Sequence, residues 1–411
     1  MSGTAAAQAL GFALSPVISR LFTPSDFGIF GSFDALLTVI AAGATLDYSQ
    51  AIMLPKKNED AINLFALSCI SVAFIGTLCM AICILFPYYI LDLIKAPTSW
   101  FLVLLVVAIL VTGFNQACQA WCVRVKSFKQ VSASQVIRSL SSNGAQIGFG
   151  IFKGGAAGLI ISNVLANMFA SINLVRVLLQ DVKTFRRDIQ WNRMKQLAKE
   201  YRDFPMYSAS ENVINALSGS LPVLLLAHFF GIAVAGAYAF GVRILTAPMG
   251  LVLSALRQVL FQKASETYNT GGRITPLYVK TTLGLFALAV FPALVFFMWA
   301  PQIFTWVFGS QWDTAGEYAR WLMLWLAFYF CNLPSVLFAR IIRIQRTMFL
   351  FNQAVLVIRF LSLLIGGLYL TSLSTVMLFS VVGAIINIIA ISIVGFALKR
   401  KEGDVAWSEI I

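Results

Sequence analysis

Charged side chains are scarce in this sequence, and their scarcity excludes a water-soluble globular protein. Only 11% of the 411 residues are Asp, Glu, Lys or Arg, whereas 59% are hydrophobic. A soluble domain carries about 25% charged residues. The chain also lacks the alternating segments of about ten residues that the strands of a membrane β-barrel require. Apolar runs of 18 residues or more recur instead, so we expect an all-α membrane protein with about 12 transmembrane helices.

Residues that hold metals or perform catalysis are equally sparse. The chain has one histidine, His228, and its six cysteines are scattered within or at the ends of apolar runs, where they are expected as small buried apolar residues. We find no nucleotide-binding loop and no paired-carboxylate motif, and the predicted outer loops are short. We therefore expect no metal site, no cofactor, no catalytic residue and no enzyme activity. Any energy input would have to come from an ion gradient.

The apolar runs define the expected membrane spans. Met1 leads into the first run without the basic leader of a signal peptide, so either the natural start is short or a few residues are missing upstream. The predicted spans, each uncertain by several residues at its ends, are 2–20, 27–53, 61–88, 99–122, 131–152, 156–180, 205–229, 233–260, 277–300, 319–340, 348–370 and 375–398.

The basic residues indicate the orientation of these spans. Twelve spans place both termini on one side, and 23 of the 30 Lys and Arg residues fall in loops on that side. Four fall on the opposite side, and three lie within spans. The positive-inside rule then places both termini in the cytoplasm. The net charge of +13 thus reflects topology and contact with anionic membrane lipids, and we expect no nucleic-acid partner.

The order of the motifs indicates an internal duplication. The pentapeptide VIRSL at 136–140 in span five resembles VIRFL at 357–361 in span eleven, and Pro-Val pairs begin at Pro16 and Pro222. Gly28 and Gly236 follow these pairs at similar distances. Two parallel six-helix bundles with a central cleft would suit alternating access. The predicted organisation is an N-terminal bundle at 1–180, an amphipathic cytoplasmic linker helix at 181–204, a C-terminal bundle at 205–398 and a cytoplasmic tail at 399–411.

Several motifs along the chain carry a family resemblance. They are SPVISRLFTPSDFGIF at 15–30, AIMLPK at 51–56, FPMY at 204–207, LPVLL at 221–225 and GAYA at 236–239. With these motifs the chain resembles the bacterial lipid-linked oligosaccharide flippases of the O-antigen type, polysaccharide transporters of the exporter superfamily that also contains the MATE drug exporters. Asp47 departs from the pattern, because the family is expected to have a basic residue in that stretch.

The resemblance implies a MATE-like fold and a location in the bacterial cytoplasmic membrane. It also implies a function: translocation of an undecaprenyl-pyrophosphate-linked oligosaccharide repeat unit from the inner to the outer leaflet, without covalent chemistry. The polyprenyl-pyrophosphate-linked glycan would be the substrate. A glycan polymerase and the chain-length machinery would be candidate partners in surface polysaccharide biosynthesis.

Three arginines inside spans are the leading candidates for substrate binding: Arg138, Arg243 and Arg359. A charge at the centre of a membrane helix costs about 2.5–3.5 kcal/mol on insertion scales, so such residues usually face a polar cavity. A guanidinium group can donate two hydrogen bonds to one phosphate. Arg243 falls near mid-depth of span eight and is the first choice. Arg138 and Arg359 are placed about two turns from the cytoplasmic ends, where snorkelling to the interface is the alternative.

Three acids inside the predicted spans are candidates for ion coupling: Asp34, Asp47 and Glu211. They could equally be static partners of the arginines, and Asp34 could pair with Arg243. Asn215 shares a helix face with Glu211, giving span seven a polar stripe that would contact sugar hydroxyls or neighbouring helices. The alternative functions are an ion-coupled MATE-like exporter of small molecules and, less favoured, a membrane polysaccharide polymerase or ligase.

Overall fold

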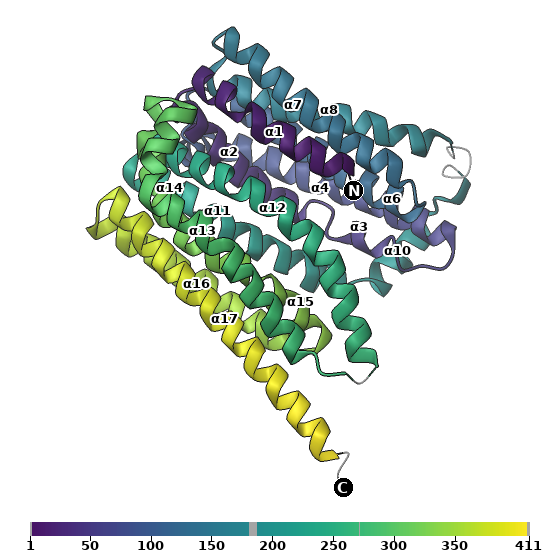
Figure 1. Cartoon of the computed structure of the whole chain (residues 1–411). Coiled ribbons are helices and arrows are strands. Elements are labelled where there is room, and N and C mark those ends of the chain that lie inside the picture. Colours follow the sequence, from purple (N-terminus) through teal and green to yellow (C-terminus); the bar gives the residue numbers. More distant parts are fainter. Residues whose placement is uncertain (1, 181–186, 271, 409–411) are drawn as a thin grey trace. The chain divides into compact units, whose positions relative to one another are not determined.

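A computed structural model describes residues 2–180, 187–270 and 272–408 of the chain (Figure 1). Every regular element within these ranges is helical, which confirms the predicted all-α class. The chain forms two compact units, unit 1 from Met1 to Gly236 and unit 2 from Ala237 to Ile411. The predicted bundles, 1–180 and 205–398, were inferred from the sequence repeat, whereas the two units are defined by their internal contacts. The division into two six-helix bundles therefore stays a prediction.

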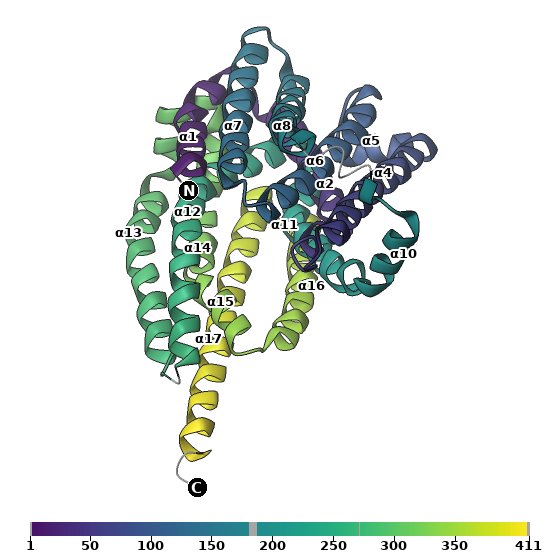
Figure 2. The ribbon, with the colours of Figure 1, turned by 90° about the vertical axis from the view of Figure 1, so that its right-hand side faces the viewer.

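Unit 1 is built around a layer of long helices. Helix α7 packs against α1 and α8, which lie beside it in both views (Figures 1 and 2), while α6 packs between α4 and α8, and α11 packs on α2. The helices of this unit are α1 (Ser2–Leu21), α2 (Pro24–Gly43), α3 (Tyr48–Ala51), α4 (Asn58–Leu85), α5 (Pro87–Ile94), α6 (Trp100–Arg124), α7 (Phe128–Ile151), α8 (Gly155–Gln180), α10 (Trp191–Glu200), a π-helical turn (Phe204–Ser208) and α11 (Ala209–Phe230).

Unit 2 centres on one helix that touches two others. Helix α14 packs against α13 and α17, and α16 runs beside α17 (Figure 2). The helices here are α12 (Ile232–Asn269), whose first turn belongs to unit 1, then α13 (Thr275–Phe308), a 3₁₀ turn (Ser310–Trp312), α14 (Asp313–Cys331), α15 (Leu333–Ile341), α16 (Gln345–Tyr369) and α17 (Ser372–Ser408).

Most of the predicted spans correspond to helices that could cross a membrane. Among the described residues, ten helical segments are long and apolar enough to do so. The predicted spans 2–20 and 131–152 are also helices, α1 and α7, but they are not among those ten. These two helices pack against each other, so the more polar members of unit 1 are neighbours.

The motif at 15–30 forms the first helical hairpin, and two sets of local side-chain hydrogen bonds stabilise it. Pro16 has no N–H to donate to the carbonyl of Phe12, and the Ser15 hydroxyl donates to that carbonyl instead at 2.6 Å. Helix α2 begins with a capping box, in which the Asp26 N–H donates to Thr23 Oγ1 at 3.2 Å and the Thr23 N–H donates to Asp26 Oδ2 at 2.9 Å.

Helix α2 ends earlier than predicted, which changes the position of Asp47. The helix stops at Gly43, and Leu46 and Asp47 adopt positive φ angles of 47° and 57° before the short α3. The prediction that Asp47 lies inside span two is therefore wrong; it lies in a turn after the span, buried. The apolar run continues through this turn, and apolar composition alone cannot reveal a left-handed backbone.

The connection after α3 is held by one side chain of α6. Arg124 donates hydrogen bonds to the carbonyl oxygens of Ile52 at 2.7 Å and Pro55 at 2.8 Å, and further ones to Lys57 O at 3.4 Å and Asn58 Oδ1 at 3.3 Å. The fixed fork of a guanidinium group suits several acceptors at once. The AIMLPK motif is thus positioned by a charge at the end of another helix.

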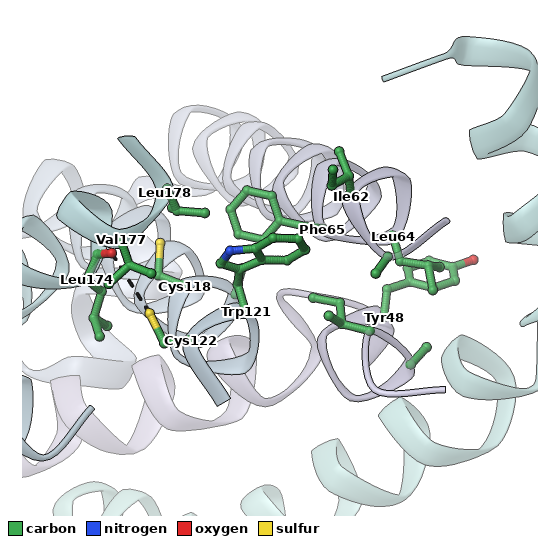
Figure 3. Packing of buried hydrophobic residues seen from close by; sticks show 14 of the residues in the cluster. Tyr48, Ile62, Leu64, Phe65, Cys118, Trp121, Cys122, Leu174, Val177 and Leu178 are labelled. Carbon is green, nitrogen blue, oxygen red and sulfur yellow. Dashed lines mark hydrogen bonds between the residues drawn. The ribbon is translucent and has the colours of Figure 1, made fainter. Parts of the chain in front are cut away.

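A hydrophobic cluster joins α4, α6 and α8 beside this connection (Figure 3). Phe65 contacts Trp121 edge-on at 5.9 Å between ring centroids, and Leu174 of the same cluster is fully buried. Cys118 and Cys122 are part of the same cluster with no exposed surface. Five of the six free cysteines are buried as expected, and Cys69 is half-buried.

The first six residues of the predicted linker helix, 181–186, lie outside the described residues. Helix α10 packs on α4 and buries Met194 and Leu197. Arg193 pairs with Asp60 at 2.6 Å. The amphipathic helix predicted here is present from Trp191 to Glu200 and is attached to unit 1.

Unit 2 contains an aromatic cluster. Trp312 has no exposed surface and packs on Phe240 at 3.9 Å between ring centroids. Phe240 also meets Phe308 edge-on at 5.1 Å. Trp306, by contrast, is 82% exposed.

Two glycines allow a very close helix crossing inside unit 1. A Cβ atom added to Gly28 would lie 1.9 Å from the carbonyl oxygen of Ile232, and one added to Gly236 would lie 1.8 Å from that of Pro24. Both distances are far below any real contact, so only glycine fits at either position. Gly28 and Gly236, which correspond in the predicted repeat, therefore meet across a single crossing of the α2 and α12 starts.

Candidate functional site

The polar interior of unit 1 is the candidate site, and Arg138 is its cation. Arg138 lies ten residues after the start of α7, about 15 Å along the axis, so it is nearer to mid-helix than the two turns predicted. Arg138 is exposed. Asp34 of α2 interacts with it electrostatically. The structure thus brings together a predicted substrate-binding residue and a predicted ion-coupling residue.

Asp34 also accepts a hydrogen bond from the first of three polar side chains that lie along α8. The Asn163 side chain donates to Asp34 Oδ1 at 3.4 Å, and the Asn167 side chain donates to Asn163 Oδ1 at 3.1 Å. The Ser171 hydroxyl donates to the Asn167 carbonyl at 2.8 Å. Because these residues are spaced by four, they form one polar stripe on the helix.

The stripe continues onto α6 and back to α7. The buried Asn115 side chain donates to Ser171 Oγ at 2.8 Å, Gln119 donates to Asn115 Oδ1, and Gln135 donates to Gln119 Oε1 at 3.4 Å. Gln135 lies three residues from Arg138 on the same helix. Polar groups in a membrane helix are costly without partners, and here each amide is hydrogen-bonded to the next. A hydrogen-bonded network of polar side chains therefore joins α2, α8, α6 and α7 within unit 1.

These amides were missed by the sequence analysis. Asn163, Asn167 and Ser171 look like isolated polar residues in an apolar run, and their spacing of four was the signal that could have found them. The partners on α6 and α7 are far away in sequence, and no local pattern links them.

Arg359 has a different environment from its predicted counterpart Arg138. It lies fourteen residues into α16, about 21 Å along the axis, and its guanidinium faces the Trp325 ring at 5.4 Å and the Phe379 ring at 5.9 Å. Stacking on aromatic faces leaves the edge of a guanidinium available to hydrogen-bond acceptors. Arg138 and Arg359, which correspond in the predicted repeat, thus have unlike neighbours, one polar and one aromatic.

The other predicted residues are placed apart from this network. Arg243 lies on α12, half-buried, eleven residues after the helix start, and it has interactions of its own. Glu211 and Asn215 are both exposed, one turn apart on α11. Asp34 belongs to unit 1 and Arg243 to unit 2, so their pairing stays a prediction.

The sequence matches one protein family over most of its length. Residues 17–317 match the sequence model of a family described as polysaccharide biosynthesis protein. A curated relative, the succinoglycan biosynthesis transport protein ExoT of Rhizobium meliloti (strain 1021), is 25% identical over 320 residues, which is 74% of this chain. The aligned region spans 60% of the length of that relative.

Two solved structures share the fold at low sequence identity. An inward-facing multidrug resistance MATE family transporter of the MOP superfamily matches with a TM-score of 0.77, 16% identity and 96% coverage of both chains. The lipid II flippase MurJ in an inward closed conformation matches with a TM-score of 0.77 and 13% identity, covering 95% of this chain and 85% of that chain. The relative and both structures are transport proteins, and the fold is MATE-like. The chain is therefore a multi-pass membrane protein that belongs to the polysaccharide biosynthesis protein family.

Proposed function

We propose that this protein flips undecaprenyl-pyrophosphate-linked oligosaccharide repeat units from the inner to the outer leaflet of the bacterial cytoplasmic membrane. The units would supply surface polysaccharide biosynthesis, and both termini would be cytoplasmic. The family, the succinoglycan transport role in the name of ExoT and the fold shared with the lipid II flippase support this proposal. The two predicted six-helix bundles would rock against each other in alternating access.

The observation that carries the proposal is the polar interior of unit 1. A sugar–pyrophosphate headgroup needs cations for its phosphates and hydrogen-bonding groups for its hydroxyls. Arg138 supplies a cation near the middle of α7, and the amides of Asn163 and Asn167 belong to the hydrogen-bonded network that begins at its neighbour Asp34. In a low-dielectric interior these groups act more strongly than they would in water.

Arg243 is proposed as the central phosphate-binding residue. It lies about 16 Å from the start of α12, close to half the thickness of a hydrocarbon core of about 30 Å. Arg138 and Arg359 would receive and pass on the same phosphate, and Asn215 would contact sugar hydroxyls. Arg359, braced against two rings, has little freedom to swing, so its role would be to hold a fixed position along the path.

Asp34 is the acid best placed to couple an ion to transport. Because it lies beside Arg138 and accepts from Asn163, protonation of Asp34 would strengthen the net positive field of Arg138 for a phosphate. Glu211 is a second candidate on α11. Asp47, the third candidate, lies in the turn after α2, beyond the end of that span.

Replacing Arg243 tests the proposal in cells that make the glycan. Arg243→Ala is expected to abolish surface glycan while the amount of protein in the membrane is unchanged, and Arg243→Lys should restore export only in part, because an ammonium group cannot bind a phosphate in a bidentate manner. Arg340→Ala, which removes an exposed arginine at the end of α15, is the matched control and should export normally. Normal export by Arg243→Ala would contradict the proposed role.

A further inference from the structure

Unit 1 carries an apolar groove between α6 and α8. Its volume is about 380 Å³, and its walls include Val111 and Phe114 on α6 and Met168, Ile172 and Leu179 on α8. Ile172 is 49% exposed and Leu179 is 62% exposed, so the groove is open along its length. Residues 168 and 179 are about 16 Å apart along a helix, roughly the depth of one leaflet's hydrocarbon layer.

One end of the groove is charged. Arg176 lines the groove in the last two turns of α8, with an exposed side chain. Of the lining residues it is the basic one, and it lies on the side that the distribution of Lys and Arg assigns to the cytoplasm. The floor holds Ser171, whose hydroxyl already accepts from Asn115 and donates to Asn167. The groove therefore offers dispersion contacts along its length and a cation at its inner end.

We propose that this groove binds one acyl chain of an anionic phospholipid of the inner leaflet, with the headgroup phosphate at Arg176. The groove lies in the half of the membrane where such a lipid has its chains, and its charge complements the headgroup. A single guanidinium matches the single negative charge of a phosphodiester. A pyrophosphate-linked lipid carries more charge and would call for more than one cation. The groove shares Ser171 with the polar network of unit 1, but its apolar walls and its basic end do not depend on the identity of the cargo.

Native mass spectrometry of the purified full chain tests this site. The protein is mixed with equal amounts of phosphatidylglycerol and phosphatidylethanolamine that have the same acyl chains, and the bound lipids are compared. Phosphatidylglycerol should be retained preferentially. Arg176→Gln should lower that preference roughly fivefold, the factor that corresponds to about 1 kcal/mol per basic side chain near an anionic headgroup. The same loss of charge at the exposed Lys129 on α7 should leave the preference unchanged.

A second pair of variants tests the groove itself. Ile172→Trp fills the groove and should lower phosphatidylglycerol retention several-fold, whereas Phe169→Trp enlarges a side chain that is 45% exposed on the same helix outside the groove and should have no effect. Equal retention of the two phospholipids, or unchanged retention in Arg176→Gln or Ile172→Trp, would overturn the proposal. So would displacement of phosphatidylglycerol by an equal amount of undecaprenyl phosphate, because the groove would then be a site for the polyprenyl tail.

Discussion

The glycine crossing in unit 1 gives the sharpest stability prediction. In Gly28→Ala the new methyl carbon would lie 1.9 Å from the Ile232 carbonyl oxygen and 2.9 Å from Ile232 Cγ1. The nearer atom belongs to the backbone, so two helices must move apart by more than 1 Å to restore ordinary contact. Overpacking of this kind costs about 1–3 kcal/mol, and more where the backbone is rigid. Gly236→Ala, 1.8 Å from the Pro24 oxygen, should cost as much.

Glycines elsewhere in unit 1 serve as controls, because they separate the steric cost at the crossing from the effect of Gly→Ala on helix propensity. Gly219 on α11 and Gly144 on α7 have nothing within 4 Å of an added Cβ atom. Replacing either by Ala should therefore stabilise the protein by about 0.5–1 kcal/mol, the ordinary gain for Gly→Ala inside a helix. The assay is thermal unfolding of each purified variant in the same detergent. Gly28→Ala and Gly236→Ala should unfold at lower temperature than the unmodified protein, and the control variants at the same or higher temperature.

The double variant sharpens this prediction. Both glycines serve one crossing, so once Gly28→Ala has separated the helices, Gly236→Ala should add less than its single cost. If Gly28→Ala is as stable as Gly219→Ala, the close crossing of the α2 and α12 starts does not exist in the folded protein. Fully additive costs would show that the glycines act at independent sites.

Two further changes test the α2–α4 connection, with thermal unfolding as the measurement. Arg124→Ala should destabilise the protein by about 2–4 kcal/mol, because it removes two short charge-assisted hydrogen bonds to backbone carbonyls. Arg340→Ala, which removes an exposed side chain, should have little effect. Equal stability of the two variants would show that Arg124 does not hold the connection. Burial raises the pKa of Asp47 from 3.8 to about 6, so its ionised form costs stability above pH 6 and this cost vanishes below about pH 4. Asp47→Asn should therefore stabilise the protein at pH 8 and have no effect near pH 4. A hydrogen bond from Lys95 lowers the pKa of the exposed Asp92, so Asp92→Asn should slightly lower the stability at pH 8 instead of raising it. If Asp47→Asn stabilises the protein equally at both pH values, the raised pKa of Asp47 is contradicted.

The positions of the helices could be predicted from the sequence because apolar runs of membrane length have few alternatives. Breaks inside those runs could not be predicted. The end of α2 at Gly43 depends on left-handed residues whose side chains, Leu46 and Asp47, carry no strong turn signal. The burial of Trp312 depends on Phe240, which is far away in sequence and reaches it only in the folded unit.

The candidate site could be predicted in part for a similar reason. The cost of a buried charge singles out Arg138 and Asp34 in any apolar run, but their proximity comes from the packing of α7 and α2 around α8. Amides carry a smaller cost, so Asn163 and Asn115 do not stand out until their hydrogen bonds are seen. The same reasoning shows why Arg138 and Arg359, alike in local sequence, differ in surroundings: each environment is set by residues outside the repeated pentapeptide.

Reconstituted transport tests the central claim most directly. The purified protein is placed in liposomes that hold undecaprenyl-pyrophosphate-linked oligosaccharide, and the fraction of glycan exposed on each face is followed with an impermeant sugar-modifying reagent. The proposed function predicts that the glycan crosses the bilayer with the unmodified protein, and that it crosses no faster with Arg243→Ala than in protein-free liposomes. Transport by Arg243→Ala at the rate of the unmodified protein, or no transport by a folded unmodified protein, would contradict it.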